Sequence, residues 1–171
     1  MKYVTVIGAG TMGNGIAHVF AQYGFDVTLN DIKQEFLDKG LATITSNLDR
    51  QVKKGVLTED AKKATLGRIK LSTDLASAAA NADIVIEAAT DNQKIKNEIF
   101  KTLDATCKPH TILASNTSSI SITEIGAVTK RPDRVIGMHF MNPVPVMKLV
   151  ELIRGLATSN ETYGTVKALS E

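Results

Sequence analysis

The sequence predicts an α/β fold built on a doubly wound, mostly parallel sheet. An apolar strand at the start of the chain runs directly into a glycine-rich turn and a helix. Short apolar segments then alternate with helical segments, and right-handed crossovers between such strands leave few other arrangements. The 171 residues are 43% hydrophobic and 22% charged, which is the composition of one domain with a sizeable core.

The glycine turn has the G-x-G-x-x-G pattern of a Rossmann-type dinucleotide cradle. It follows the predicted strand Tyr3–Ile7 and opens a helix expected over Thr11–Gln22. Gly8 makes the tight turn, Gly10 lets the backbone approach a pyrophosphate, and Gly13 lets helix and strand pack closely. Free amides and the helix dipole would hold the anion without a basic side chain. The predicted cofactor-binding positions of this turn are Gly8, Gly10, Thr11, Met12 and Gly13.

An acidic residue follows the second predicted strand, where a dinucleotide site needs one. Asp31 comes directly after the strand Asp26–Asn30, about twenty residues beyond the glycines. Its carboxylate is expected to hold ribose hydroxyls and to repel a 2′-phosphate, so the pattern favours NAD over NADP. The alternative is that Asp31 is the N-cap of a helix that begins near Ile32.

Charge and cysteine content exclude several classes of protein. The net charge is +2 and the lysines are dispersed, which does not favour a nucleic-acid partner. The single cysteine, Cys107, cannot form an intramolecular disulfide, and no cluster of Cys and His has metal-ligand spacing. No apolar run approaches the roughly 18 residues of a membrane span. We therefore expect a soluble, cytoplasmic protein with no metal, nucleic-acid or membrane partner.

Two consecutive helices are predicted between the second and third strands, where a short crossover would suffice. They run from Gln34 to about Lys54 and from Glu59 to about Gly67, as a helical hairpin over about 34–67. Lys53 and Lys54 at its tip are candidates to meet a phosphate-bearing substrate. The alternative is that they are solvated lysines at a helix C-terminus.

Strands and helices alternate again beyond the hairpin. Strands are expected at 69–72, 83–87, 111–114, 134–139 and 148–153, and helices over 92–105, 121–125 and from 160 onward. Ligands of parallel sheets bind outside the carboxyl ends of the strands, so polar residues just past those ends are candidates for a site. These residues are Asp91, Ser115, Asn116, Thr117, Ser118 and His139.

His139 is the candidate proton carrier. A site that interconverts an alcohol and a ketone by hydride transfer needs an acid/base near the oxygen, and an unperturbed imidazole pKa of about 6.5 suits this role. Glu151 lies beyond a proline-containing turn that can bring its carboxylate back toward His139, where it would fix the imidazole tautomer and stabilise the cation. The alternatives are a purely structural histidine and an edge-strand glutamate paired with Lys148 or Arg154.

Neutral groups complete the candidate site. Ser118 and Asn142 can hold a carbonyl oxygen and a carboxamide by hydrogen bonds. A serine-rich turn can equally cap the helix that begins near Ser121. The other two histidines, His18 and His110, are expected to be surface or packing residues.

Together, these motifs resemble the nucleotide-binding domain of 3-hydroxyacyl-CoA dehydrogenases over essentially the whole chain. The segments that carry the resemblance are Val6–Gly13, Ile86–Ala89, Ala114–Ser119 and Gly137–Glu151. The resemblance implies reversible, NAD-dependent oxidation of short-chain 3-hydroxyacyl-CoA to 3-oxoacyl-CoA, with acetoacetyl-CoA as an example, in fatty acid and butyrate metabolism.

The resemblance also implies a role for individual residues. His139 becomes the catalytic acid/base, Glu151 its orienting partner, and Ser118 a group near the substrate carbonyl and the nicotinamide. It implies further contacts to the cofactor from Asp31, Asp91, Lys96 and Asn142, and to the coenzyme A phosphates from Lys54. Asp91 stands where the family usually has glutamate, so its contact is expected to be weaker or bridged by water.

The resemblance makes residues 1–171 one NAD-binding domain. Members of the family continue into a helical domain that supplies dimer contacts and part of the acyl pocket. We therefore expect a fragment of a longer, homo-oligomeric enzyme, or else a natural truncation that turns over poorly because domain closure completes such sites. A non-catalytic NAD-binding module and a methyltransferase are the other functions considered, and neither needs an acid/base pair.

Overall fold

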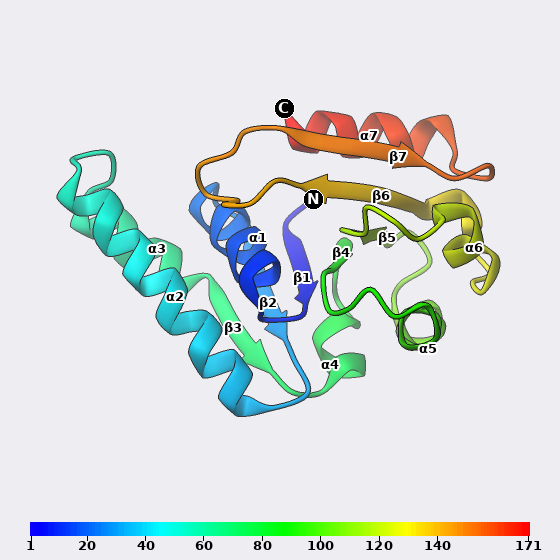
Figure 1. Cartoon of the computed structure of the whole chain (residues 1–171), viewed down its shortest axis with the longest axis horizontal. Coiled ribbons are helices and arrows are strands. Elements are labelled where there is room, and N and C mark those ends of the chain that lie inside the picture. The colour runs from blue at the N-terminus through cyan, green and yellow to red at the C-terminus, as the bar shows by residue number, and fades with distance from the viewer.

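Seven strands form one sheet in the order β3-β2-β1-β4-β5-β6-β7, in a computed structural model that describes all residues 1–171 (Figure 1). Every neighbouring pair is parallel except β6 and β7, which are antiparallel. This is the doubly wound, mostly parallel sheet that the sequence predicts. The strands are β1 (Tyr3–Ile7), β2 (Asp26–Asn30), β3 (Ile69–Ser72), β4 (Ile84–Glu87), β5 (Ile112–Ser115), β6 (Val135–Phe140) and β7 (Val150–Arg154).

Helices cover both faces of the sheet. One face packs against α1, α2 and α7, and the other against α4, α5 and α6. Strand β4 shows why, because Ile84 and Ile86 point into the first apolar cluster and Val85 into the second. None of the helices is both long and apolar enough to cross a membrane. The α-helices are α1 (Thr11–Gln22), α2 (Gln34–Lys53), α3 (Glu59–Gly67), α4 (Leu75–Ala79), α5 (Gln93–Thr106), α6 (Ile122–Ala127) and α7 (Asn160–Ser170).

The predicted elements are present, with bounds that differ by up to about two residues. Sequence analysis missed only the short helix α4 and a 3₁₀ turn at Pro132–Arg134. Helix α4 has five residues, which is too short to show a helical repeat of apolar positions. It begins at an N-cap, Asp74, whose side chain accepts a hydrogen bond from the backbone of Ala76 at 3.2 Å.

The α2–α3 hairpin projects from one side of the sheet and packs on α1 (Figure 1). His18 of α1 is fully buried at this contact, with Nε2 at 2.9 Å from the side-chain oxygen of Gln22 and 3.3 Å from that of Gln51. Burial lowers the pKa of His18, so the neutral imidazole is favoured. His110 instead lies exposed beside Asp83. His18 therefore packs helices together and does not face the sheet edge.

Arg131 fixes the C-terminal end of α5. Its Nε donates to the Asp104 carboxylate at 2.8 Å, and both side chains are almost buried. The guanidinium also donates to backbone carbonyl oxygens at the end of α5 and in the segment that leads to β5. These oxygens belong to Asp104, Cys107, Lys108 and Thr111. This ion pair lies at the end of α5 remote from the carboxyl ends of the strands.

Cys107, just beyond α5, is expected to be inert in the folded protein. Burial raises the pKa of its thiol to about 11, and the side chain packs in the second apolar cluster. At pH 8 we expect iodoacetamide to modify the native chain at least about a hundred times more slowly than the chain in 6 M guanidinium, because the thiolate is the reacting form. Mass spectrometry of timed samples measures both rates. Equal rates would contradict the burial of this thiol.

Candidate active site

The glycine turn after β1 leaves no room for side chains at two positions and an open face at a third. Gly8 has φ of +99°, and a Cβ there would lie 2.6 Å from the carbonyl oxygen of Ala88. A Cβ on Gly13 would lie 1.7 Å from the carbonyl oxygen of Gly8. By contrast, no atom lies within 4 Å of a Cβ on Gly10. The turn therefore has the close helix–strand packing that the motif predicts and is open where a ligand backbone group must approach.

The first turn of α1 has backbone amides without partners. Its N-cap, Gly10, has no side chain to accept from them. The Asn14 amide donates to Gly10 oxygen at 2.9 Å, so the three amides before it, from Thr11 to Gly13, precede the first bond of the helix. Together with the positive end of the helix dipole, they fit the pyrophosphate of a dinucleotide.

Asp31 lies beside this turn. One of its carboxylate oxygens accepts the Ala9 amide at 2.8 Å, and the other accepts the Ile32 amide at 2.7 Å. The N-cap of α2 is Lys33, so the alternative that Asp31 caps this helix is wrong. The two bonds fix the carboxylate at the end of β2, and its remaining lone pairs are free for hydroxyl donors.

Glu87 at the end of β4 is fully buried, and sequence analysis did not identify it as a site residue. Its carboxylate accepts the Lys96 ammonium at 2.6 Å and the Ser115 hydroxyl at 2.7 Å. The Lys96 side chain is only 2% exposed, and its predicted contact with a cofactor stays a prediction. A charged residue closing an otherwise apolar strand is the signal that could have identified Glu87.

The turn after β5 presents Ser118 to solvent. The Thr117 hydroxyl accepts the amide of Ile120 at 3.1 Å, which closes the turn around the exposed Ser118. Asn116 connects this turn to the next strand, because its side-chain oxygen accepts the amide of Phe140 at 2.9 Å. Asn116 was one of the polar candidates just past a strand end. The residue to which it bonds, Phe140, is the neighbour of His139 in the chain.

His139 and Glu151 face each other across the antiparallel pair β6–β7. They are direct partners in the register, and His139 Nδ1 lies 3.7 Å from Glu151 Oε1. This is an ion-pair distance, longer than a hydrogen bond. Glu151 has no ion pair with Lys148 or Arg154, and Arg154 donates instead to the carbonyl oxygen of Thr158 at 2.7 Å. The edge-pair alternative for Glu151 is therefore wrong.

The remaining predicted contacts lie on exposed segments. Asp91 precedes the N-cap of α5, and Asn142 follows β6. Lys54 is the C-cap of α2 at the tip of the hairpin. No hydrogen bond or ion pair within the chain engages any of these three side chains, so all three are available to a ligand.

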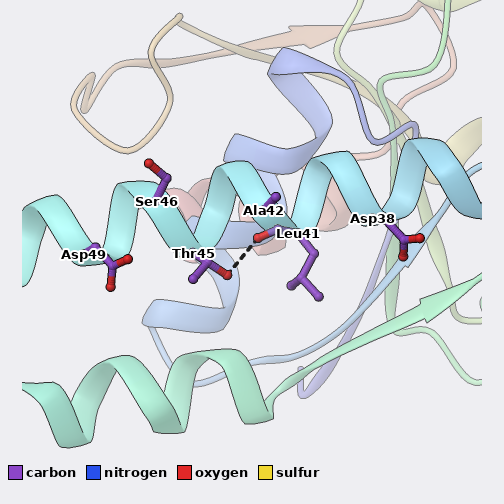
Figure 2. A pocket seen from close by; sticks show the side chains of 6 residues that line it. All are labelled: Asp38, Leu41, Ala42, Thr45, Ser46 and Asp49. Atoms are coloured by element: carbon purple, nitrogen blue, oxygen red, sulfur yellow. Dashed lines mark hydrogen bonds between the residues drawn. The ribbon is translucent and has the colours of Figure 1, made fainter.

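Two hollows lie away from the acid/base pair. A shallow groove of about 470 Å³ follows α2, and Figure 2 shows Thr45 in it bonded to the backbone of Leu41 at 2.9 Å. Carboxylates of Asp38 and Asp49 line it, which disfavours phosphate groups. A largely apolar hollow of about 580 Å³ lies between α1, the segment 144–148 and the end of α7. Neither hollow is lined by the catalytic candidates.

The glycine turn, the acid after β2 and the histidine–carboxylate pair at the same end of the sheet define a Rossmann-type dinucleotide-binding domain. Residues 3–171 match the family model described as "3-hydroxyacyl-CoA dehydrogenase, NAD binding domain". The chain belongs to this family, and NAD is the cofactor of the domain.

Relatives with known names agree with this assignment. The chain is 57% identical to a "Probable 3-hydroxybutyryl-CoA dehydrogenase" of Bacillus subtilis, over all of this chain and 59% of that protein. A "3-hydroxybutyryl-CoA dehydrogenase" of Bradyrhizobium diazoefficiens is 55% identical over 98% of this chain and 57% of its own. The crystal structure of (S)-3-hydroxybutyryl-CoA dehydrogenase from Ralstonia eutropha superposes with a TM-score of 0.96, at 55% identity, over 99% of this chain and 60% of its own. The chain thus spans about three-fifths of the length of these relatives.

Two glycine substitutions should separate packing from binding. Gly13→Ala puts a methyl group into the Gly8 carbonyl, so we expect the melting temperature to fall by at least about 10 °C. Gly10→Ala has open space, so stability should stay near the parent while NADH affinity falls at least about tenfold. Thermal unfolding and NADH fluorescence titration measure these effects, with Gly164→Ala on α7 as the control. Unchanged affinity in Gly10→Ala would contradict the cradle.

Proposed function

We propose that the full-length protein catalyses the reversible, NAD-dependent interconversion of short-chain 3-hydroxyacyl-CoA and 3-oxoacyl-CoA, with acetoacetyl-CoA and 3-hydroxybutyryl-CoA as the pair. The observation that carries this proposal is the cross-strand pair of His139 and Glu151. Their side chains lie 3.7 Å apart at the carboxyl end of the parallel strands, where the glycine turn also lies. The names of the relatives support the substrate class, since they are 3-hydroxybutyryl-CoA dehydrogenases.

His139 serves as the acid/base of the proposed reaction. In the direction of reduction, the imidazolium donates its proton to the developing alkoxide, and in oxidation the neutral ring removes it. Glu151 lies on the Nδ1 side, which leaves Nε2 for the substrate, and it stabilises the imidazolium. Ser118, exposed on the turn after β5, donates a hydrogen bond to the same substrate oxygen. Bound NADH supplies the hydride.

The cofactor is held by groups on several strand ends. The amides of α1 hold the pyrophosphate, and Asp31 holds the adenosine ribose hydroxyls. Further contacts to the cofactor are assigned to Lys96, Asp91 and Asn142. The Lys96 ammonium has three donors, so its bond to Glu87 still leaves donors for the cofactor.

The coenzyme A portion of the substrate is assigned to the hairpin. Lys54 is exposed at the hairpin tip without an acidic partner, so its ammonium can pair with a phosphate. The chain spans about three-fifths of its relatives' length, which supports a further helical domain that completes the acyl pocket and mediates homo-oligomers. A regulatory NAD module or a methyltransferase would have no use for an acid/base pair at this position.

His139→Gln tests the proposed acid/base. We expect His139→Gln in the full-length protein to lower turnover of acetoacetyl-CoA at least about a hundredfold, because the neutral amide cannot exchange a proton. NADH binding should stay within about twofold, since the cradle is untouched. Absorbance at the NADH band measures turnover, and fluorescence titration measures binding. His110→Gln, an exposed histidine at the other end of the sheet, is the control, and parental turnover in His139→Gln would exclude the assignment.

Asp31→Ala tests the proposed choice of cofactor. Asp31→Ala removes the ribose acceptor and the repulsion of a 2′-phosphate, so NADH affinity should fall at least about tenfold while the preference for NADH over NADPH narrows. Fluorescence titration with both cofactors measures the two affinities. Asp38→Ala removes an exposed acid of α2 as the control. If Asp31→Ala leaves both affinities as they are, Asp31 is not the ribose ligand.

A further inference from the structure

We propose that Glu87 is a positioning residue that sets the two strand-end turns bordering the nicotinamide site through its buried carboxylate. This inference rests on the proposed function, because the turns matter for the reaction that we assign to them. Glu87 is fully buried at the last position of β4, the strand between β1 and β5 in the sheet. It therefore lies between the nucleotide cradle and the turn that carries Ser118.

The carboxylate divides its two oxygens between different segments. Oε1 accepts the Lys96 ammonium of α5 at 2.6 Å and the Ser115 hydroxyl of β5 at 2.7 Å. Oε2 accepts the Ala89 amide at 2.8 Å and the Thr90 amide at 3.4 Å in the turn after β4. All four partners are donors, so only the ionised, acceptor-only form satisfies them together.

Each bonded segment borders the proposed site. The turn after β4 packs against the glycine turn, since a Cβ on Gly8 would lie 2.6 Å from Ala88 oxygen. On the other side, the Ser115 hydroxyl donates a hydrogen bond to Glu87 and accepts one from the Thr117 amide at 3.3 Å. Ser118 follows directly. One carboxylate thus fixes both the back of the cradle and the turn that presents Ser118.

Glu87 also reaches the strand of the acid/base residue through its backbone. Its carbonyl oxygen accepts the Asn116 amide at 2.9 Å, and the Asn116 side chain accepts the amide of Phe140 at 2.9 Å. Phe140 is the neighbour of His139 on β6. Two consecutive hydrogen bonds therefore connect the last residue of β4, the residue after β5 and the last residue of β6.

A contribution to stability alone does not account for this arrangement. A buried ion pair adds little net stability, because desolvation offsets the attraction, and an apolar pair of similar volume often serves a core equally well. An apolar pair could not accept the amide of Ala89 or the hydroxyl of Ser115. What the Glu87–Lys96 pair adds is an ordered acceptor between two polar turns.

Three substitutions in the full-length protein separate the parts of this network. Glu87→Gln keeps the shape but replaces one acceptor oxygen by an NH2 group. The Lys96 ammonium needs the remaining oxygen, so the NH2 group faces the amides of Ala89 and Thr90, and the turn after β4 should lose its anchor. Ser115→Ala removes only the connection to the turn after β5. Asp104→Asn, at the other end of α5, breaks the nearly buried pair with Arg131 and is the control for loss of stability.

The first readout is amide hydrogen exchange in the ligand-free protein, which does not depend on activity. We expect Glu87→Gln to lower protection of the Ala89 amide at least about tenfold, Ser115→Ala to lower it at Thr117 only, and Asp104→Asn to change neither. Parental protection of Ala89 in Glu87→Gln, or of Thr117 in Ser115→Ala, would overturn the proposal.

The second readout is steady-state kinetics with acetoacetyl-CoA. We expect kcat to fall at least about tenfold in Glu87→Gln and less in Ser115→Ala, with KM for acetoacetyl-CoA within about threefold, since the hairpin that holds coenzyme A is untouched. Asp104→Asn should keep the parental kcat although it melts earlier. If Glu87→Gln loses protection but keeps the parental kcat, the anchor is structural and the positioning role is wrong.

The failure of the proposed function gives a different result. In that case the parent protein shows no NADH-dependent reduction of acetoacetyl-CoA, while the exchange pattern of the three variants remains as expected. The hydrogen-bond network of Glu87 would then be confirmed, and the assigned reaction would be wrong. An active parent with the wrong exchange pattern overturns the role of Glu87 alone.

Discussion

The approach of helix α1 to the glycine turn is the constraint on which the site depends. A Cβ on Gly13 would lie only 1.7 Å from the carbonyl oxygen of Gly8, so the helix can start where it does only because that side chain is missing. Its N-cap, Gly10, has no side chain to satisfy the first amides. The same packing that closes helix onto strand therefore leaves these amides to a ligand, and an anion is the group that they favour.

From this turn, a series of short contacts follows the carboxyl edge of the sheet. Each joins neighbouring strands: Asp31 to Ala9, Ala88 to Ile7, Glu87 to Ser115, Asn116 to Phe140, and Glu151 to His139. All but the last involve a backbone group or a buried side chain, so they hold the strand ends in fixed relation. The glycine turn and the proposed acid/base pair therefore belong to one framework. Such a framework suits the proposed reaction, because reacting groups misplaced by an ångström react far more slowly.

Local sequence patterns predicted most residues at the carboxyl end of the sheet. They could not predict which residues distant in the sequence bond to one another there. The glycine spacing and the strand before it identified the cradle, and the proline-containing turn placed Glu151 near His139. The role of Glu87 stayed hidden because its hydroxyl partner Ser115 lies 28 positions away. Lys96 was expected to face the cofactor, and the bond to Glu87 depends on how α5 crosses the sheet. Alternating polarity shows which face a side chain takes, but it does not show which donor it meets there.

The proposed acid/base pair, His139 and Glu151, is the most exposed part of the framework. The His139 side chain is 27% exposed and that of Glu151 is 55% exposed, at 3.7 Å. In water an attraction over such a distance is worth only about 1 kcal/mol, and it grows several-fold when the surroundings are less polar. Glu151 lies on β7, the edge strand, so nothing within the sheet covers it. A domain packed over this edge, as we propose, would exclude water, shorten the contact and strengthen the charge stabilisation that the proton transfer needs.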